Sequence, residues 1–462
     1  MRVLLLNPPG KQSYLRDYYC TSITKSDYYY HPVDLLYLSG TLSLEHEVSF
    51  IEALRRGFSN EETIQEIKKI DPQAIICLVA APSFEEDILF LTDLHNQMPQ
   101  VQIVGTGDIF REYREKMFDV MPFLNATLVD FSTDDILRYL RGSNGDIINN
   151  VIYRHNGQVA VGLEKHGHGQ FTIPTPLFNL FDKRHYTFPF VRQEPFMSVL
   201  SDFGCPYGCT FCPISTLGFK MRSIEEVMAE LEKIWDTGYR EVHFRDQTFA
   251  VNKERSLKLC KAIGKTLPGL TWSCFSRVDV LDEDRVKAMV QSGCHSVIVG
   301  IEFDNDQMQK LLKKNINRHQ MFEAIKICHR HKLNVAGTFI LGLPDDDEEA
   351  MMRTSALSRA LDLDFASFNL ATPRLGSTWR RQLLGDDQIN SQDLKMDTVK
   401  GTESFRRAKL NQQQLRRLRL KIERDFYLRP QYIFNRMRKL RSITEFRTLL
   451  RNGFSIFLGG QQ

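Results

Sequence analysis

Short apolar runs alternate with helical patterns over the first 140 residues of the chain. The runs Val3–Leu6, Ile75–Val79 and Val101–Val104 are bounded by Pro, Gly or Asp, as expected for strands that are buried on both faces. Between them, Asn60–Ile70 and Phe84–Gln97 carry apolar residues at helical spacing. This alternation predicts a parallel, doubly wound sheet, in which ligands bind at the carboxyl ends of the strands.

A second α/β series begins near residue 196, after a stretch without periodicity. That stretch, 141–190, is rich in Gly, Asn, His and Pro, and Asn156-Gly157 indicates a hairpin within it. The second series predicts a partial or complete parallel β/α barrel, with its active site at the carboxyl ends of the strands. Its expected strands are Ser198–Ser201, Glu241–Phe244, Thr271–Ser273, Ser296–Gly300, Asn334–Ile340 and Phe365–Asn369.

The pattern therefore predicts an α/β protein of four parts. They are a doubly wound, Rossmann-like domain at 1–140, a linker at 141–190, a β/α barrel core at 191–390 and a basic helical region at 391–462.

Composition narrows the class of protein. Of 462 residues, 42% are hydrophobic and 25% are charged, as in ordinary globular proteins. The longest apolar runs are far shorter than the roughly 20 residues that span a bilayer, and residues 1–9 lack the pattern of an export signal. We therefore expect a cytoplasmic protein whose nine cysteines are free thiols or metal ligands rather than disulfides.

The net charge of +3 conceals a basic C-terminal stretch. Residues 406–451 hold 15 Lys or Arg against three acidic residues, with apolar residues at helical spacing from Leu415 to Met437. The ordinary interpretation is a helical cap over the open end of the barrel, with the arginines on a solvated face. The alternative is peripheral contact with an anionic membrane or with a phosphorylated substrate. No nucleic-acid partner is expected, because no recognised RNA- or DNA-binding module accompanies the charge.

Three cysteines stand within eight residues, directly after the first expected strand of the second series. Cys205, Cys209 and Cys212 have the spacing C-x3-C-x2-C. Thiolates gathered in one loop bind soft metals or iron–sulfur clusters. Three ligands are one short of the four that complete a four-iron cluster, so one iron would stay open to a substrate or cofactor. The alternative is a zinc site of Cys3His type, completed by His243 or His295.

The other cysteines differ in their setting. Cys20 lies in a polar, Tyr-rich loop and is the other candidate reactive thiol. The remaining five stand in apolar periodic segments and are expected to be small core residues: Cys77, Cys260, Cys274, Cys294 and Cys328.

The cysteine spacing resembles that of the radical SAM superfamily. The resemblance implies that Cys205, Cys209 and Cys212 hold a [4Fe–4S] cluster whose open iron binds S-adenosylmethionine, which is cleaved to methionine and a 5′-deoxyadenosyl radical. Segments at four later strand ends resemble the same superfamily, so that the resemblance spans roughly residues 190–375. It implies S-adenosylmethionine contacts at Phe211, Asp246, Gln247, Ser276, Arg277 and Glu302. Gln247 departs from the pattern, because relatives often carry a second acid there.

The first domain resembles the cobalamin-binding class of that superfamily. Relatives begin with a strand ending in Asn-Pro-Pro and continue with a Pro and an apolar helix ending in Gly, as residues 7–9 and 32–40 do here. The resemblance implies cobalamin contacts at Asn7, Pro8, Pro9, Ser83, Gly105 and Asp108. The chain lacks the Asp-x-His-x-x-Gly of some members, and residues 105–108 read Gly-Thr-Gly-Asp where relatives often have Gly-Gly-x-His. The alternative is a degenerate domain kept for packing or partner binding.

Together these resemblances imply a cobalamin-dependent radical SAM enzyme that methylates an unactivated carbon. Some relatives cyclise or rearrange rings without methyl transfer, and this is the first alternative. The second is a zinc-stapled interaction protein. The expected partners are a small-molecule, lipid or peptide substrate and an electron donor such as flavodoxin or ferredoxin. The sequence identifies neither the substrate nor the catalytic residues.

Overall fold

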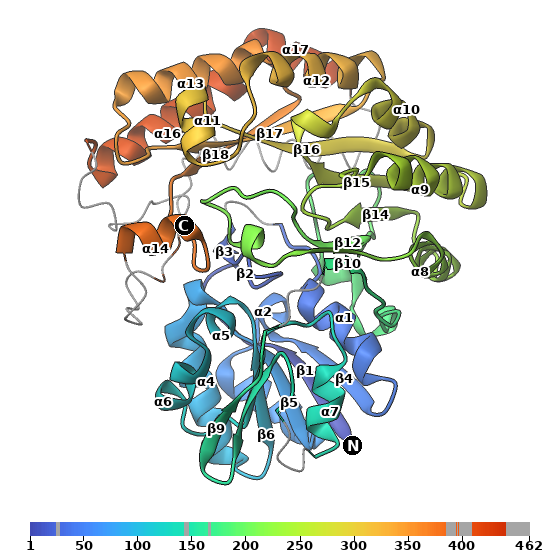
Figure 1. The fold of residues 1–462 in the computed structure, drawn as a ribbon, viewed down its shortest axis with the longest axis vertical. Coiled ribbons are helices and arrows are strands. Elements are labelled where there is room, and N and C mark those ends of the chain that lie inside the picture. The colour runs from blue at the N-terminus through green and yellow to red at the C-terminus, as the bar shows by residue number, and fades with distance from the viewer. Residues whose placement is uncertain are drawn as a thin grey trace.

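Two α/β units follow one another along the chain in the computed structural model (Figure 1). The structure describes residues 1–24, 28–142, 147–164, 168–384, 394, 396 and 409–439. The first unit is built on a seven-stranded sheet and the second on a six-stranded sheet. The predicted α/β class, with a Rossmann-like sheet ahead of a partial barrel and helices after it, is confirmed.

The first sheet has helices on both faces. Its strands are β1 (Arg2–Asn7), β4 (Glu47–Glu52), β5 (Ala74–Leu78), β6 (Gln102–Thr106), β7 (Ala126–Leu128), β8 (Val151–His155) and β9 (Gln158–Val161). They are ordered β4-β1-β5-β6-β7-β8-β9, and the first five in this order are parallel. Alternate residues of β1 join the two cores on opposite faces of the sheet, as the period of two in a strand requires. All five residues of β5 are buried, which explains its uninterrupted apolar run.

The helices of this unit include two whose limits match the predicted ones. Asn60–Ile70 is α3 and Phe84–Gln97 is α4. The others are α1 (Val33–Leu42), α2 (Ala53–Arg56), α5 (Asp108–Tyr113), α6 (Met117–Val120) and α7 (Asp135–Leu140). The hairpin expected at Asn156-Gly157 joins β8 to β9, and both turn residues have positive φ, 49° and 78°, as a tight hairpin turn requires. This hairpin forms the edge of the first sheet.

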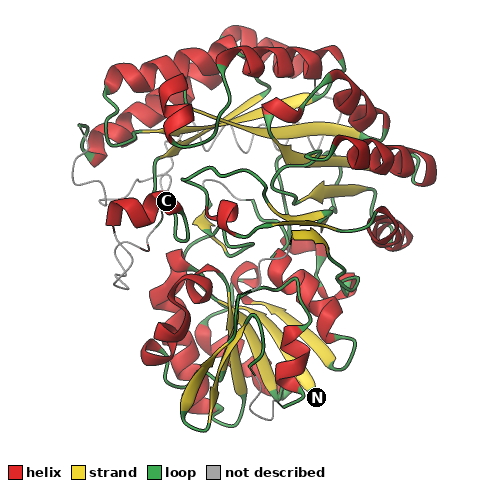
Figure 2. Cartoon of the chain, in the orientation of Figure 1, coloured by secondary structure: helices red, strands yellow, loops and turns green. Residues whose placement is uncertain are grey.

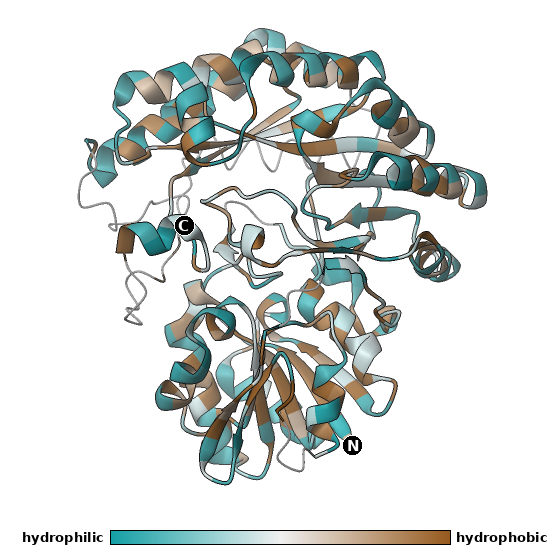
Figure 3. Ribbon diagram, in the orientation of Figure 1, coloured by the Kyte–Doolittle hydropathy of each residue, from teal (hydrophilic) through white to brown (hydrophobic). Residues whose placement is uncertain are grey.

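The second sheet is parallel throughout. Its strands are β11 (Met197–Val199), β14 (Glu241–Phe244), β15 (Thr271–Ser276), β16 (Cys294–Glu302), β17 (Asn334–Leu341) and β18 (Phe365–Leu370), in that order across the sheet. Figure 2 shows helices on the side of this sheet that faces away from the first unit, and Figure 3 shows that both sheets are more hydrophobic than the helices around them. The helices are α8 (Ile224–Asp236), α9 (Lys253–Thr266), α10 (Glu283–Gln291), α11 (Asp306–Leu311), α12 (Arg318–Arg330), α13 (Glu348–Ala360) and α14 (Thr378–Leu384).

The first strand of the core, β11, is shorter than predicted because the chain turns at Leu200 into a small separate sheet. There β12 (Asp202–Gly204) pairs antiparallel with β13 (Phe219–Met221), which pairs in turn with β10 (His168–Gln170). The cysteine loop connects β12 to β13, so both of its ends are held by strand pairing. A capping box of Ser223 and Glu226 then starts α8, as its sequence pattern favours.

Two helices of the C-terminal region pack against the second sheet. The helix α16 (Gln412–Tyr427) buries Leu415, Leu418, Ile422 and Phe426, in agreement with the predicted helical spacing. It is followed by α17 (Pro430–Lys439). Residues 440–462, and all but two of residues 385–408, lie outside the described residues, so the predicted membrane contact of the basic stretch stays a prediction. Within the described part of the chain, no helix is both long and apolar enough to cross a bilayer.

A buried polar network joins the two units. The hydroxyl of Tyr37, on α1 of the first unit, accepts a hydrogen bond from the backbone N–H of Leu200 (2.7 Å) and donates one to Glu230 on α8 (2.8 Å). Glu230 also pairs with Arg222 at 2.5 Å. The side chains of Arg222 and Glu230 are at most 1% exposed. Because water does not reach them, each polar group of the network depends on the others for its hydrogen bonds.

Replacing Tyr37 by Phe should destabilise the fold, because it leaves a buried carboxylate oxygen and the N–H of Leu200 without a partner. An unsatisfied buried group costs about 1–3 kcal/mol, so we expect the free energy of unfolding, measured by urea denaturation, to fall by about this amount. Tyr139→Phe is the matched control, because the described residues offer its hydroxyl no hydrogen-bond partner and the expected change is below about 0.5 kcal/mol. Equal effects of the two substitutions would contradict the role of the network.

Candidate active site

One large cavity lies between the two units at the carboxyl ends of the strands of the second sheet. Its volume is about 1140 Å³, which exceeds the roughly 300–1,000 Å³ of a site for one small ligand. On the core side it is lined by residues that lie in or directly after β14, β15, β16, β17 and β18. On the side of the first unit it is lined by Leu15, Cys20, Ser22, Ile23, Tyr28 and Tyr30. The cavity therefore has room for more than one bound group.

The three cysteines of the C-x3-C-x2-C loop all line this cavity. The loop begins at Gly204, whose φ is +80° and where a Cβ would lie 2.0 Å from the carbonyl oxygen of Gly218. Only glycine can stand here, because the two backbone segments approach too closely for a side chain. The N–H of Gly204 donates to the hydroxyl of Tyr18 (2.6 Å), and the N–H of Cys205 donates to the Gly218 carbonyl (3.0 Å). The first unit thus helps to fix the start of the cysteine loop.

The environment of the thiols suits soft-metal ligation. Burial raises the pKa of the Cys205 and Cys212 thiols, and neighbouring cysteines raise the pKa of Cys212 further. A coordinated metal would deprotonate them. Arg277 donates from Nη1 to Sγ of Cys209 (3.5 Å), and Thr248 Oγ1 lies 3.7 Å from Sγ of Cys205. Hydrogen bonds to sulfur are one means by which proteins set the potential of iron–sulfur clusters.

The zinc alternative lacks its histidine. His243 and His295 are buried in the core sheet, where His243 bonds to Ser273 (2.9 Å) and His295 to Glu241 (2.7 Å), and neither lines the cavity. In the part of the chain that the structure describes, no three His, Cys, Asp or Glu side chains converge as they do around a single ion. The two histidines of the zinc alternative are therefore engaged in the core sheet and not beside the thiols.

Asp246 does not face the cavity. Its carboxylate accepts hydrogen bonds from the backbone N–H groups of Ser201 (2.6 Å) and Asp202 (3.1 Å) and from the Ser201 hydroxyl (2.5 Å). These residues lead from β11 into the cysteine loop. In this structure the carboxylate holds the turn that leads into the loop, and the direct S-adenosylmethionine contact predicted for Asp246 stays a prediction. Burial raises the pKa of Asp246, and these hydrogen bonds oppose that shift.

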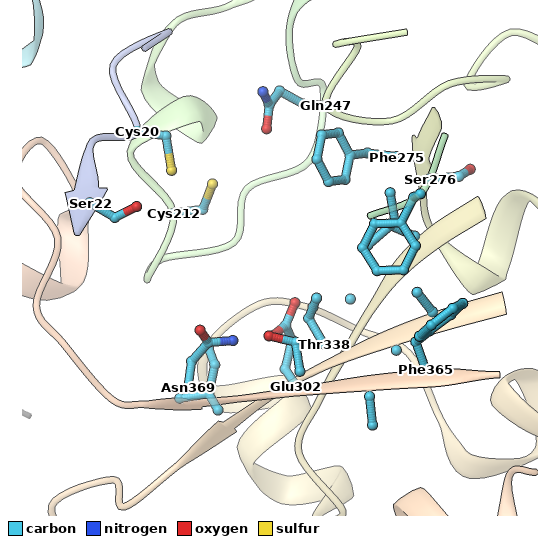
Figure 4. Close-up of a pocket in the computed structure, with 18 of the residues that line it drawn as sticks. Cys20, Ser22, Cys212, Gln247, Phe275, Ser276, Glu302, Thr338, Phe365 and Asn369 are labelled. Atoms are coloured by element: carbon cyan, nitrogen blue, oxygen red, sulfur yellow. The ribbon is translucent and has the colours of Figure 1, made fainter. Parts of the chain in front are cut away.

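Four further predicted S-adenosylmethionine contacts, Phe211, Gln247, Ser276 and Arg277, do line the cavity. Arg277 pairs with both carboxylate oxygens of Asp279 at 2.9 Å, stacks at 3.8 Å on the ring of Tyr207 and donates to the carbonyl of Lys314. Arg277 therefore connects the cysteine loop to the end of β15. Figure 4 shows Gln247 and Ser276 at the edge of the cavity.

Glu302, the last predicted contact, stands at a β-bulge at the end of β16. Its φ of +67° is unusual for a residue other than glycine, and such strain persists where the surroundings impose it, often at functional sites. Its carboxylate pairs with buried Lys314 at 3.3 Å across Gly300. A Cβ at Gly300 would lie 2.1 Å from Glu302 Oε1 and 2.6 Å from Lys314 Nζ. Figure 4 shows Glu302 beside Thr338 and Asn369, all reaching the cavity.

The strand ends of the first sheet are covered by the chain's own segment 11–24. Arg16 of this segment is fully buried and forms an ion pair with Asp87 at 2.6 Å. Its other hydrogen bonds go to Ser83 Oγ (3.0 Å), Asn7 Oδ1 (3.1 Å) and the carbonyls of Pro8 (2.8 Å) and Pro9 (3.1 Å). The predicted cobalamin contacts among these residues therefore bind Arg16 in this structure.

Gly105 and Asp108, the other two predicted cobalamin contacts, are also engaged within the chain. Asp108 accepts from the Thr21 hydroxyl (2.5 Å) and from the N–H of Ala81 (3.1 Å). A Cβ at Gly105 would lie 2.1 Å from the ring of Phe110. None of the six predicted residues lines the cavity, so they do not fit a cobalamin as direct contacts in this arrangement, and their role stays a prediction.

Sequence reasoning did not single out several residues that the fold brings to the cavity. Cys20, named only as a reactive thiol, points its sulfur toward that of Cys212 (Figure 4). Arg374, after β18, donates to Cys20 Sγ (3.4 Å) and to the carbonyl of Thr21 (3.1 Å). Arg245 adjoins Asp246 at the end of β14 and faces the cavity. The sequence signal that could have identified Arg245 and Arg374 is their position, because both follow strands of the core sheet.

The fold and the site define an α/β enzyme with a thiol-bearing loop at the strand ends of a partial barrel. Residues 202–357 match the family model of the radical SAM superfamily, which spans the cysteine loop and the four strands β14 to β17. The chain therefore carries a radical SAM domain at these residues. Over 452 residues it is 27% identical to an uncharacterized methyltransferase of Pyrococcus horikoshii, and the match covers 94% of each chain.

Two solved structures show the same arrangement of a Rossmann-like domain and a radical SAM core. The cobalamin-dependent S-adenosylmethionine radical enzyme OxsB, solved with aqua-cobalamin and S-adenosylmethionine, is 14% identical, with a TM-score of 0.72 over 99% of this chain and 71% of that one. The radical methyltransferase TsrM of Kitasatospora setae, solved with cobalamin and a [4Fe–4S] cluster, is 16% identical, with a TM-score of 0.65 over 83% of this chain and 77% of that one. At these identities the likeness establishes the fold.

The neighbours Asp246 and Gln247 should give different phenotypes. Asp246→Ala leaves two buried N–H groups and a hydroxyl unpaired, so we expect the free energy of unfolding to fall by about 2 kcal/mol or more, as measured by urea denaturation. Gln247→Ala should change that free energy by less than about 0.5 kcal/mol but weaken S-adenosylmethionine binding in equilibrium dialysis of the reconstituted protein. Full stability of Asp246→Ala would show that its carboxylate does not position the loop.

Proposed function

We propose that this protein is a radical SAM methyltransferase that uses cobalamin and acts on an unactivated carbon. The observation that carries the proposal is the placement of three thiols, from one loop, in a large cavity at the strand ends of the core. In this proposal Cys205, Cys209 and Cys212 hold a [4Fe–4S] cluster. Phe211, Gln247, Ser276, Arg277 and Glu302 surround S-adenosylmethionine.

The residues of the chain have supporting roles around these groups. Arg277 hydrogen-bonds the Cys209 sulfur and holds Tyr207, so it would tune the cluster and keep its loop in place. Asp246 fixes the start of the loop. The two units line the cavity from opposite sides. Lys314 holds Glu302 in its strained conformation at the cavity edge.

The bound groups would supply the chemistry that side chains cannot. When bound, the reduced cluster supplies the electron that cleaves S-adenosylmethionine, and cobalamin carries the methyl group. Because segment 11–24 covers the strand ends of the first sheet, a corrin would lie on the cavity side of this segment. The residues of the segment that line the cavity are the apolar Leu15 and Ile23 beside Cys20 and Ser22, which suits the largely apolar face of a macrocycle.

Methyl transfer is favoured over ring closure by the similarity to a methyltransferase over nearly the whole chain. The electron donor, a flavodoxin or ferredoxin, stays a prediction. A substrate of small-molecule size accords with a cavity of about 1140 Å³. The functional test is to incubate the anaerobically reconstituted, reduced protein with cobalamin and methyl-labelled S-adenosylmethionine. We expect 5′-deoxyadenosine and methionine, about one retained cobalt per chain, and label in the bound corrinoid. If the protein cleaves S-adenosylmethionine but retains no cobalt, methylation would be rejected in favour of cyclisation or rearrangement.

Cluster content should depend on the three loop cysteines and on no other thiol in the cavity. After anaerobic reconstitution with iron and sulfide, we expect about four irons per chain in the wild type, as in other [4Fe–4S] proteins. Cys205→Ala, Cys209→Ala and Cys212→Ala should each lose most of this iron and the visible absorbance of the cluster.

Cys20→Ser is the matched control, because Cys20 lines the same cavity opposite Cys212. It should retain the iron and acid-labile sulfide of the wild type. Loss of the cluster in Cys20→Ser, or its retention in all three alanine variants, would overturn the assignment of the ligands. One zinc per chain without sulfide would also overturn it.

A further inference from the structure

The cavity has an aromatic wall that the cluster and S-adenosylmethionine do not require. We use the name aromatic wall for Tyr28, Tyr30, Phe188, Phe190 and Phe365, all of which line the cavity. Their rings form a continuous series of edge contacts, with centroids 6.1 Å apart for Tyr28 and Phe188, 5.6 Å for Tyr30 and Phe188, 5.3 Å for Phe188 and Phe190, and 5.1 Å for Phe190 and Phe365. Rings arranged in this way offer a broad apolar surface to a flat ligand.

Three separate parts of the chain build this wall. Residues 28–30 come from the first unit, residues 188–190 from the connection between the units, and Phe365 from the edge strand β18. Phe275 reaches the same cavity from β15, and Figure 4 shows both Phe275 and Phe365 there. A wall assembled from all three parts lies within the cavity between the units and not in the core of either one.

Arg245 stands at one end of the wall with hydrogen-bonding capacity left over. Its side chain stacks on Tyr30, with Cζ 3.7 Å from the ring centroid, and its Nη2 forms an ion pair with Asp17. The residue is only 3% exposed, yet Nε and Nη1 are buried without a hydrogen-bond partner among the described residues. Leaving charged N–H groups unpaired in a buried position is unfavourable, so an acceptor supplied by a ligand would be strongly favoured.

The acids that line the cavity do not supply that acceptor. Glu302 pairs with Lys314, and Glu423 pairs with Arg419 at 2.9 Å. The other arginines that line the cavity have fewer buried N–H groups without a hydrogen-bond partner. Arg277 and Arg374 have partners as described above, and Arg419 and Arg436 each have one buried nitrogen without a partner, Nε, whereas Arg245 has two. Arg245 is therefore the best-placed cation for an anionic group of a ligand that lies on the wall.

We propose that Arg245 binds the carboxylate of a substrate whose flat, apolar body lies along the aromatic wall. The inference rests on the proposed function, since it assigns the substrate class of the same cavity. Charge-assisted hydrogen bonds from guanidinium to carboxylate are among the strongest in proteins, and Asp17 holds the guanidinium in place through Nη2. The carboxylate of S-adenosylmethionine is the other possible source of the same chemistry, and the test separates the two.

The probes are 1-pyrenebutyrate and 1-pyrenebutanol, which share a flat aromatic body and differ in the carboxylate. Binding to the anaerobically reconstituted full chain is followed by the change in pyrene fluorescence. We expect the wild type to bind the acid at least about tenfold more tightly than the alcohol, as one charge-assisted hydrogen bond predicts. The measurement needs no turnover, so it stands even if the protein cleaves no S-adenosylmethionine and the proposed function fails.

Two variants remove the preference in different ways. Arg245→Lys keeps a cation beside Asp17 but loses the free N–H groups, and should reduce the preference for the acid to about threefold or less. Because an unpaired Asp17 could disturb folding, Asp17→Asn combined with Arg245→Met removes the whole pair and should abolish the preference while pyrenebutanol still binds. Arg240→Met is the control, because Arg240 stacks on Trp235 at 3.7 Å outside the cavity, and its preference should match the wild type.

Three results would overturn the proposal. The first is equal affinity of the wild type for the acid and the alcohol, or no binding of either. The second is a preference that survives in the double variant. The third is a loss of S-adenosylmethionine affinity in Arg245→Lys, measured by equilibrium dialysis, without a change in the preference between the probes. That outcome would assign Arg245 to the carboxylate of S-adenosylmethionine.

Discussion

The ion pair between Asp17 and Arg245 fixes the geometry on which the cavity depends. Asp17 belongs to the segment after β1 of the first unit, and Arg245 follows β14 of the second. Both are about 4% exposed, and a buried pair of this kind contributes less to stability than to the choice of one arrangement. The neighbouring Tyr18 binds the backbone of Gly204, directly before the cysteine loop. The carboxyl ends of the second sheet therefore face segment 11–24 of the first unit across a single cavity.

This arrangement explains how the loop of three thiols is held in place. The small sheet of β12 and β13 fixes both ends of the loop, Asp246 holds the turn before it, and Arg277 holds its middle. Each support comes from a different element, so the thiols are positioned by the fold and not by the loop alone. Preorganisation of this kind is what a reactive site requires. Segment 11–24, which carries Asp17 and Tyr18, also covers the strand ends of the first sheet through the contacts of Arg16.

The sequence predicted those features that follow from local pattern. The limits of α3 and α4 agree with the predicted ones, because their apolar spacing and, for α3, the capping box of Ser59 and Glu62 are local signals. The spacing of the three cysteines is also a local signal, and it correctly indicated the loop that lines the cavity. The contacts of Arg16 and Arg245 could not be predicted, because their acidic partners lie 71 and 228 residues away and buried ion pairs leave no periodic pattern. Residues 188–190 were assigned to a linker because they lack periodicity, yet they build part of the aromatic wall. The limits of the four predicted parts stay predictions.

The central claim is that the three thiols hold a cluster with one iron open toward the cavity. The most direct test is the electron paramagnetic resonance spectrum of the reconstituted, dithionite-reduced protein, recorded with and without S-adenosylmethionine. If one iron is open, adding S-adenosylmethionine should shift the signal of the reduced cluster, because its amino and carboxylate groups become ligands. A reduced-cluster signal that stays the same at saturating S-adenosylmethionine would contradict the account, as would the absence of any iron–sulfur signal.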